Sequence, residues 1–115
     1  MTGAGDTIFA LATAQGKAGV AIVRISGPES CAALTAMGVS PPVPRSSRLA
    51  TLRDSEGDIL DQALVLFFER GASFTGEDVI ELHLHGSVAV VRAVLMELER
   101  MPSLRMAEPG EFTRR

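Results

Sequence analysis

The sequence predicts an α+β fold, with a mixed or antiparallel sheet and two or three helices. Three patterns indicate this class: β-branched runs that alternate in polarity, two segments with helical apolar spacing, and turns rich in glycine or proline between them. The expected order is two strands, a helix, a strand pair, another strand, a second helix and a last short strand. This order favours helices on one face of a sheet over a regular βαβ repeat.

The first predicted strands are residues 7–13 (TIFALAT) and 20–26 (VAIVRIS), which flank the turn AQGKAG. The turn contains Gly-Lys, but a phosphate-binding loop needs glycine where Leu11 stands and Ser or Thr where Ala18 stands. We therefore interpret it as a glycine turn. The alternative is a set of backbone donors that approach a ligand closely.

The first helix is predicted within residues 26–38, SGPESCAALTAMG. Pro28 suits a first helical turn, Glu29 suits the positive end of the helix dipole, and Gly38 suits the C-terminal end. The next stretch, 39–47, contains three of the six prolines and is predicted to be a loop.

The second half is predicted to contain a hairpin, a strand, a helix and a short strand. The hairpin pairs 48–54 with 59–69, and Gly57 takes the left-handed position in its turn. Residues 74–86 form the next strand, and apolar residues spaced by three and four indicate a helix over 87–101. A strand over 104–108 then leads into PGEFTRR.

Composition limits the classes of function. A chain of 115 residues with 46% hydrophobic residues can hold one core, so we expect a single domain over 1–115. A formal net charge of −3 and a pI near 5.3 argue against nucleic-acid binding by this chain alone. Its one cysteine, Cys31, and the lack of a leader or membrane-spanning pattern predict a reduced, cytoplasmic protein. The abrupt end at Arg115 suggests a fragment.

Ionisable side chains alternate along the strand in FTGEDVIELHLHG. Glu81, His83 and His85 share one face, and the leucines between them share the other. Three interpretations stay open: a solvated face, a pocket wall with a recognition carboxylate, and a metal site. The metal site is disfavoured because alternate residues on a strand lie about 6.5 to 7 Å apart.

Arg24 bears on the pocket interpretation. It shares a face with Val20 and Ile22, so its guanidinium projects from an aliphatic strand and needs an anionic partner if buried. Either Glu81 pairs with Arg24 structurally, or both residues flank a ligand. Spacing alone does not decide between these alternatives.

Three motifs in register carry a family resemblance: DTIFALAT with GKAGVAIVRISG (6–27), SFTGEDVIELHLHG (73–86) and EPGEFTRR (108–115). Together they resemble the N-terminal domain of the bacterial tRNA uridine-modifying GTPases, the MnmE or TrmE family. The resemblance implies a homodimerising domain that binds 5-formyltetrahydrofolate or a related tetrahydrofolate, similar in fold to the folate domains of the glycine-cleavage T-protein type. A purely structural dimerisation module is the alternative.

The resemblance also implies what lies outside these residues. The family's chain continues into a helical domain with an inserted GTPase module, where GTP, magnesium and potassium belong. With a flavin-dependent partner of the MnmG type, the full protein helps to install an aminomethyl-type group on C5 of the wobble uridine of tRNA. We expect this chain alone to bind folate and dimerise without turnover, with no catalytic residue and no metal or membrane.

Two of the family's folate contacts, an arginine and a glutamate, match Arg24 and Glu81, and a third, a lysine, lies beyond the chain's last residue. A reduced pterin presents an amide N–H beside an exocyclic amine, a pair that the Glu81 carboxylate suits, while Arg24 suits the carbonyl or carboxylates of a folate. His83 and His85 are expected to border the wall, His85 more closely. The chain departs from the family at TAQGKAG, at HGS and at Glu108, which stands in place of an arginine.

Overall fold

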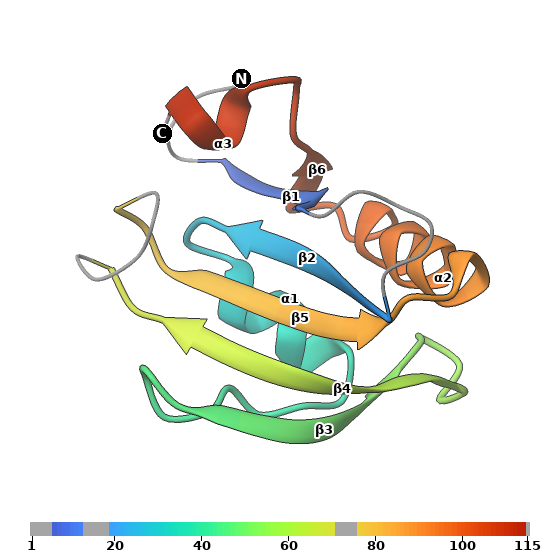
Figure 1. Ribbon diagram of the computed structural model, residues 1–115. Coiled ribbons are helices and arrows are strands. Elements are labelled where there is room, and N and C mark those ends of the chain that lie inside the picture. Colours follow the sequence, from blue (N-terminus) through green and yellow to red (C-terminus); the bar gives the residue numbers. More distant parts are fainter. Residues whose placement is uncertain (1–5, 13–18, 71–75, 115) are drawn as a thin grey trace.

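The computed structural model describes residues 6–12, 19–70 and 76–114 (Figure 1). The elements, in chain order, are β1 Thr7–Leu11, β2 Val20–Ser26, α1 Ser30–Ala36, β3 Ser47–Arg53, β4 Ile59–Phe68, β5 Val79–His85, α2 Val88–Glu99, β6 Leu104–Met106 and α3 Glu111–Arg114. The predicted α+β class is confirmed, because the sheet is mixed and carries three helices in the described residues. None of the helices in these ranges is long and apolar enough to cross a membrane.

The sheet has six strands in the order β3-β4-β5-β2-β1-β6. All neighbouring pairs are antiparallel except β1 and β6, which are parallel. The central strands, β5 and β2, therefore come from distant parts of the sequence, as Figure 1 shows. Their register places Arg24 opposite Glu81 and Ile22 opposite His83.

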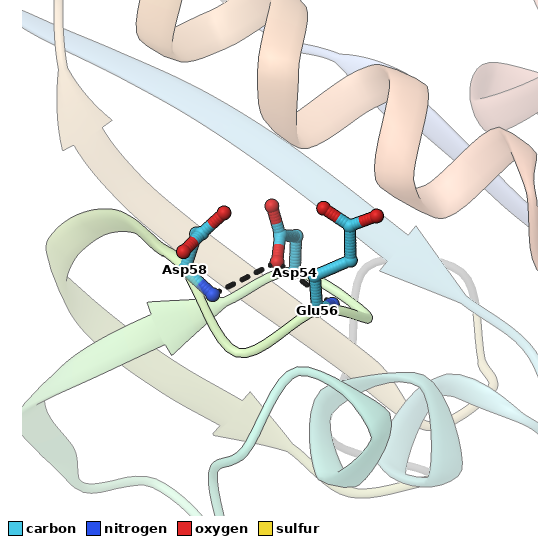
Figure 2. Close-up of side chains that lie close together, drawn as sticks. All are labelled: Asp54, Glu56 and Asp58. Carbon is cyan, nitrogen blue, oxygen red and sulfur yellow. Dashed lines mark hydrogen bonds between the residues drawn. The ribbon is translucent and has the colours of Figure 1, made fainter.

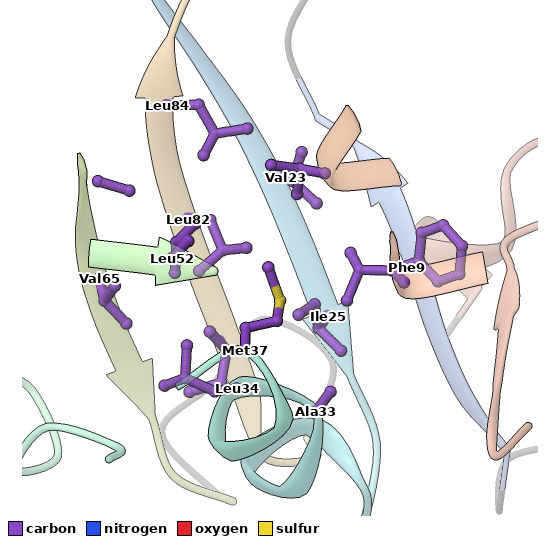
Figure 3. Close-up of a cluster of buried hydrophobic side chains, with 14 of the residues drawn as sticks. Phe9, Val23, Ile25, Ala33, Leu34, Met37, Leu52, Val65, Leu82 and Leu84 are labelled. Atoms are coloured by element: carbon purple, nitrogen blue, oxygen red, sulfur yellow. The ribbon is translucent and has the colours of Figure 1, made fainter. Parts of the chain in front are cut away.

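One face of the sheet packs against α1 and α2. Buried side chains of β2, β4 and β5 form the core with Leu34 of α1, Met37 just after α1, and Leu98 of α2 (Figure 3 shows part of it). The strand residues on this face alternate with the partly exposed residues of the other face, as expected for a half-covered sheet. We call the second face, which carries Arg24, Glu81 and His83, the open face.

Several predicted boundaries shift. Helix α1 begins at Ser30, after the predicted Pro28 position, because the turn before it is tied to β1: the Glu29 N–H donates to Thr7 Oγ1 at 2.8 Å. Strand β5 begins at Val79, and residues 74 and 75 of the predicted strand lie outside the described residues. Before β5, Gly76 has φ 81° and the Asp78 carbonyl accepts from the Gly27 N–H at 2.9 Å. Gly57 has the predicted left-handed conformation, φ 87°.

Two other regions differ from expectation. The short helix α3 forms within the PGEFTRR segment, for which the sequence predicted no element. The predicted first strand ends at Leu11, although the Ala12 N–H still donates to the Ile22 carbonyl at 2.7 Å. Of the predicted glycine turn at 14–19, only Gly19 lies among the described residues.

Candidate ligand-binding site

Arg24 and Glu81 form an ion pair in the middle of the open face. Arg24 Nε donates to Glu81 Oε2 at 2.7 Å, and the two residues are direct partners across β2 and β5. Their side chains are 33% and 13% exposed, so the carboxylate is the more enclosed partner. The structure thus brings both sequence-predicted site residues together.

Glu81 has a second partner in His83. Glu81 Oε1 lies 3.0 Å from His83 Nε2, and since an ionised carboxylate only accepts, this bond requires the proton on Nε2. Burial alone raises the pKa of the Glu81 carboxyl, but the hydrogen bonds and charges of Arg24 and His83 outweigh it and hold the pKa below its ordinary value. Glu81 is therefore an ionised acceptor at neutral pH.

His85 turns away from this group. Its Nδ1 lies 2.7 Å from Asp61 Oδ1, and its backbone N–H donates to Asp61 Oδ2 at 2.9 Å. The structure reverses the order expected for the two histidines, because His83 contacts Glu81 and His85 does not. Glu81, His83 and His85 consequently do not converge on a common point.

A cavity of about 430 Å³ lies beside Arg24. One wall comes from β1 and the residue after it, the other from the segment between β6 and α3 and from the start of α3 itself. The lining residues are Ala10, Leu11, Ala12, Arg24 and residues 107–112. We call this space the Arg24 cavity; its volume lies within the range typical of small-molecule sites.

Glu81 is not one of the lining residues of the Arg24 cavity, but it bonds Arg24, which is. A guanidinium can bond a carboxylate and a ligand at once, because it carries donors on each of its nitrogens. Glu81 can thus orient Arg24 toward the cavity. An acceptor role toward ligand donors remains compatible with its chemistry, because each carboxylate oxygen has two lone pairs.

Sequence reasoning missed most of the second wall. Phe112 and Glu111 line the cavity, and Glu108, noted only as a departure from the family, lines it as well. The motif PGEFT is the sequence signal for this wall, because it contains Glu111 and Phe112. Its Gly110 has φ 78°, which turns the chain back toward β1.

Carboxylates also cluster in the β3–β4 turn (Figure 2). Oxygens of Asp54, Glu56 and Asp58 lie within 4.8 Å of one another. Asp54 Oδ1 accepts from the backbone N–H groups of Glu56 and Asp58, both at 2.9 Å. This arrangement closes the turn.

The fold and the cavity define a class: an α+β domain with an arginine-lined pocket at the edge of a half-covered sheet. Comparison with known families makes the assignment more specific. The family model described as "GTP-binding protein TrmE N-terminus" matches residues 7–115. The chain belongs to this family.

Relatives named "tRNA modification GTPase MnmE" agree with this assignment. The chain is 56% identical over 110 residues to the protein of Cereibacter sphaeroides and 55% identical over 111 residues to that of Anaplasma phagocytophilum. Each match covers 96% of this chain but only 26% and 24%, respectively, of the relative. The chain thus spans about a quarter of the length of the curated relatives it matches.

Proposed function

We propose that this chain binds a tetrahydrofolate derivative, 5-formyltetrahydrofolate in the first instance, in the Arg24 cavity. The observation that carries the proposal is the cavity itself, lined by Arg24, whose Nε is held by Glu81. A folate combines a flat heteroaromatic ring with carbonyl and carboxylate oxygens. Arg24 supplies a permanent cation for those oxygens, and Phe112 and the apolar β1 residues supply surface for the ring.

Glu81 has two roles in this proposal. It fixes the orientation of Arg24, and its ionised carboxylate accepts from the N–H donors of the pterin at the edge of the cavity. The pterin then shares the carboxylate with Arg24 and His83. In this proposal the chain alone binds the folate without turnover.

The proposed context is the N-terminal part of a cytoplasmic tRNA modification GTPase, as in the relatives' name. There the folate supplies a one-carbon unit for an aminomethyl-type group on C5 of the wobble uridine. GTP, magnesium and potassium belong to a separate GTPase module, and a flavin-dependent protein of the MnmG type and tRNA join in the full complex. None of these is assigned to a residue of this chain.

Homodimerisation is the second proposed role. Val20, Leu49 and Leu64 on the open face are 49%, 60% and 38% exposed, respectively. They share a surface with Gln62, His83 and His85 that we call the apolar surface. A second copy of the chain is the proposed occupant, as the family resemblance implies, and covering this surface would remove apolar area from water.

The rival class is a structural dimerisation module, in which the Arg24–Glu81 pair only joins two strands. Thermal unfolding of the chain with increasing 5-formyltetrahydrofolate separates the two. A ligand of the native state raises Tm in proportion to the logarithm of its excess over Kd. A Tm that does not respond at any ligand concentration supports the structural module.

A further inference from the structure

Arg105 on β6 lies behind the second wall of the Arg24 cavity. It is not one of the lining residues, but it contacts one of them on both oxygens: Nη1 donates to Glu111 Oε1 at 2.8 Å and Nη2 to Glu111 Oε2 at 2.5 Å. Its Nε donates to Asp6 Oδ2 at 3.1 Å. One guanidinium therefore joins the end of the sheet to the start of α3.

Glu111 passes this restraint to the rest of the wall. Its Oε1 also accepts from the Glu108 backbone N–H at 2.9 Å, and the Glu111 N–H donates to the Glu108 carbonyl at 2.9 Å. Glu111 is 8% exposed, so the carboxylate is held in an enclosed position. The Glu111 side chain thus closes the turn from 108 to 111, and Arg105 holds its carboxylate through two hydrogen bonds.

A backbone bond attaches the start of the wall to the sheet. The Ala107 N–H donates to the Phe9 carbonyl at 2.9 Å, continuing the β6–β1 pairing by one residue. Phe112 lies five residues further along the chain, in α3. The hydrogen bonds from Arg105 to Glu111, and then the one to Asp6, raise the pKa of Arg105, so its guanidinium stays protonated.

We propose that Arg105 is a positioning residue of the Arg24 cavity: acting through Glu111, it sets the place of residues 108–112 relative to Arg24 and thereby the affinity for the folate. This inference rests on the proposed function. A bidentate guanidinium restrains both the distance and the angle of a carboxylate, whereas a lysine restrains the distance alone. Arg105→Ala removes both hydrogen bonds to Glu111 and so leaves the wall less restrained. Arg105→Lys keeps a positive charge near Glu111 and so retains part of the restraint.

The test combines amide hydrogen exchange with calorimetric titration of 5-formyltetrahydrofolate into the 115-residue chain. Arg105→Ala is expected to accelerate exchange at the Glu108 and Glu111 amides and to leave the Ala107 amide unchanged. Affinity is expected to fall about tenfold in Arg105→Ala and about threefold in Arg105→Lys.

Asp6→Asn is the matched control, because it removes the charge of Arg105's other partner, which is not part of the cavity lining. Its affinity and its exchange at Glu108 are expected to match the parent. Unchanged affinity in Arg105→Ala, or faster exchange that includes Ala107 to the same extent, overturns the inference. If the parent chain itself does not bind, the folate proposal fails, and exchange alone decides whether Arg105 fixes the wall.

Discussion

Arg24 and Glu81 face each other on adjacent antiparallel strands, joined by a 2.7 Å bond from Arg24 Nε to Glu81 Oε2. The pair lies between two other features of the open face. On one side Arg24 lines the cavity, and on the other Glu81 bonds His83. The chemistry of the site therefore depends on one carboxylate that remains ionised and on one cation that it orients.

Stability should depend on pH through Glu81. Because the folded-state pKa of Glu81 lies below its ordinary value of 4.5, its contribution is fully present above that pH and is lost as the pH falls through the lower folded value. Urea unfolding at about pH 6 should show Glu81→Gln to be less stable than the parent by about 1 kcal/mol, a gap that narrows near pH 3. A gap that widens on acidification would contradict the direction of the pKa shift.

Glu108 should weaken folate binding. It is one of the residues that line the Arg24 cavity, and folate carries carboxylates of its own, so we expect the Glu108 carboxylate to repel them. Calorimetric titration of Glu108→Gln should show affinity about threefold higher than the parent, with a smaller gain at high salt. Equal or lower affinity in Glu108→Gln would mean that Glu108 does not face the charged part of the ligand.

Gly27 should tolerate no side chain. Its φ is 138°, and an added Cβ would lie 2.6 Å from the Thr7 Cα, a backbone atom of β1 that cannot move aside. Gly27→Ala is expected to lower the free energy of unfolding by about 2 kcal/mol or more. Gly57→Ala is the control, since Gly57 also has a positive φ but open space around it, and should cost on the order of 1 kcal/mol. Equal losses at both positions would refute the steric part of the argument.

The apolar surface should mediate self-association. Leu49 is 60% exposed on the edge strand β3, and Leu49→Asp places a charge there without disturbing the core. Light scattering at a chain concentration on the order of tens of micromolar should give the molar mass of a dimer for the parent and of a monomer for Leu49→Asp. Val43→Asp is the control, because Val43 is 73% exposed in the loop before β3. A dimer that survives Leu49→Asp would place the contact elsewhere.

Much of the fold could be predicted from the sequence, because alternation and helical spacing are local. The faces of β2 and β5 follow from their side-chain period, which correctly separated Arg24 and Glu81 from the core residues. The pairing of β2 with β5 does not follow, since nothing local specifies which strands become neighbours. The parallel pairing of β6 with β1 is likewise a result of tertiary packing.

The second wall of the site was beyond local reasoning. Helix α3 has four residues, too few to show a helical period, and its position depends on Arg105, six residues before Glu111. His85 is another example: its alternation with Glu81 and His83 predicted a shared environment. The His85 ring instead hydrogen-bonds Asp61 of the neighbouring strand β4.

The most direct test of the account is calorimetric titration of 5-formyltetrahydrofolate into the parent chain, Arg24→Ala, Glu81→Ala and the control Arg92→Ala. Arg92 is an exposed arginine of α2, on the covered side of the sheet, so its variant loses the same charge without touching the cavity. The account predicts binding in the parent and in Arg92→Ala, with affinity at least about tenfold weaker in Arg24→Ala and in Glu81→Ala. Binding that is equal in all four proteins would contradict the assignment of the Arg24 cavity as the folate site.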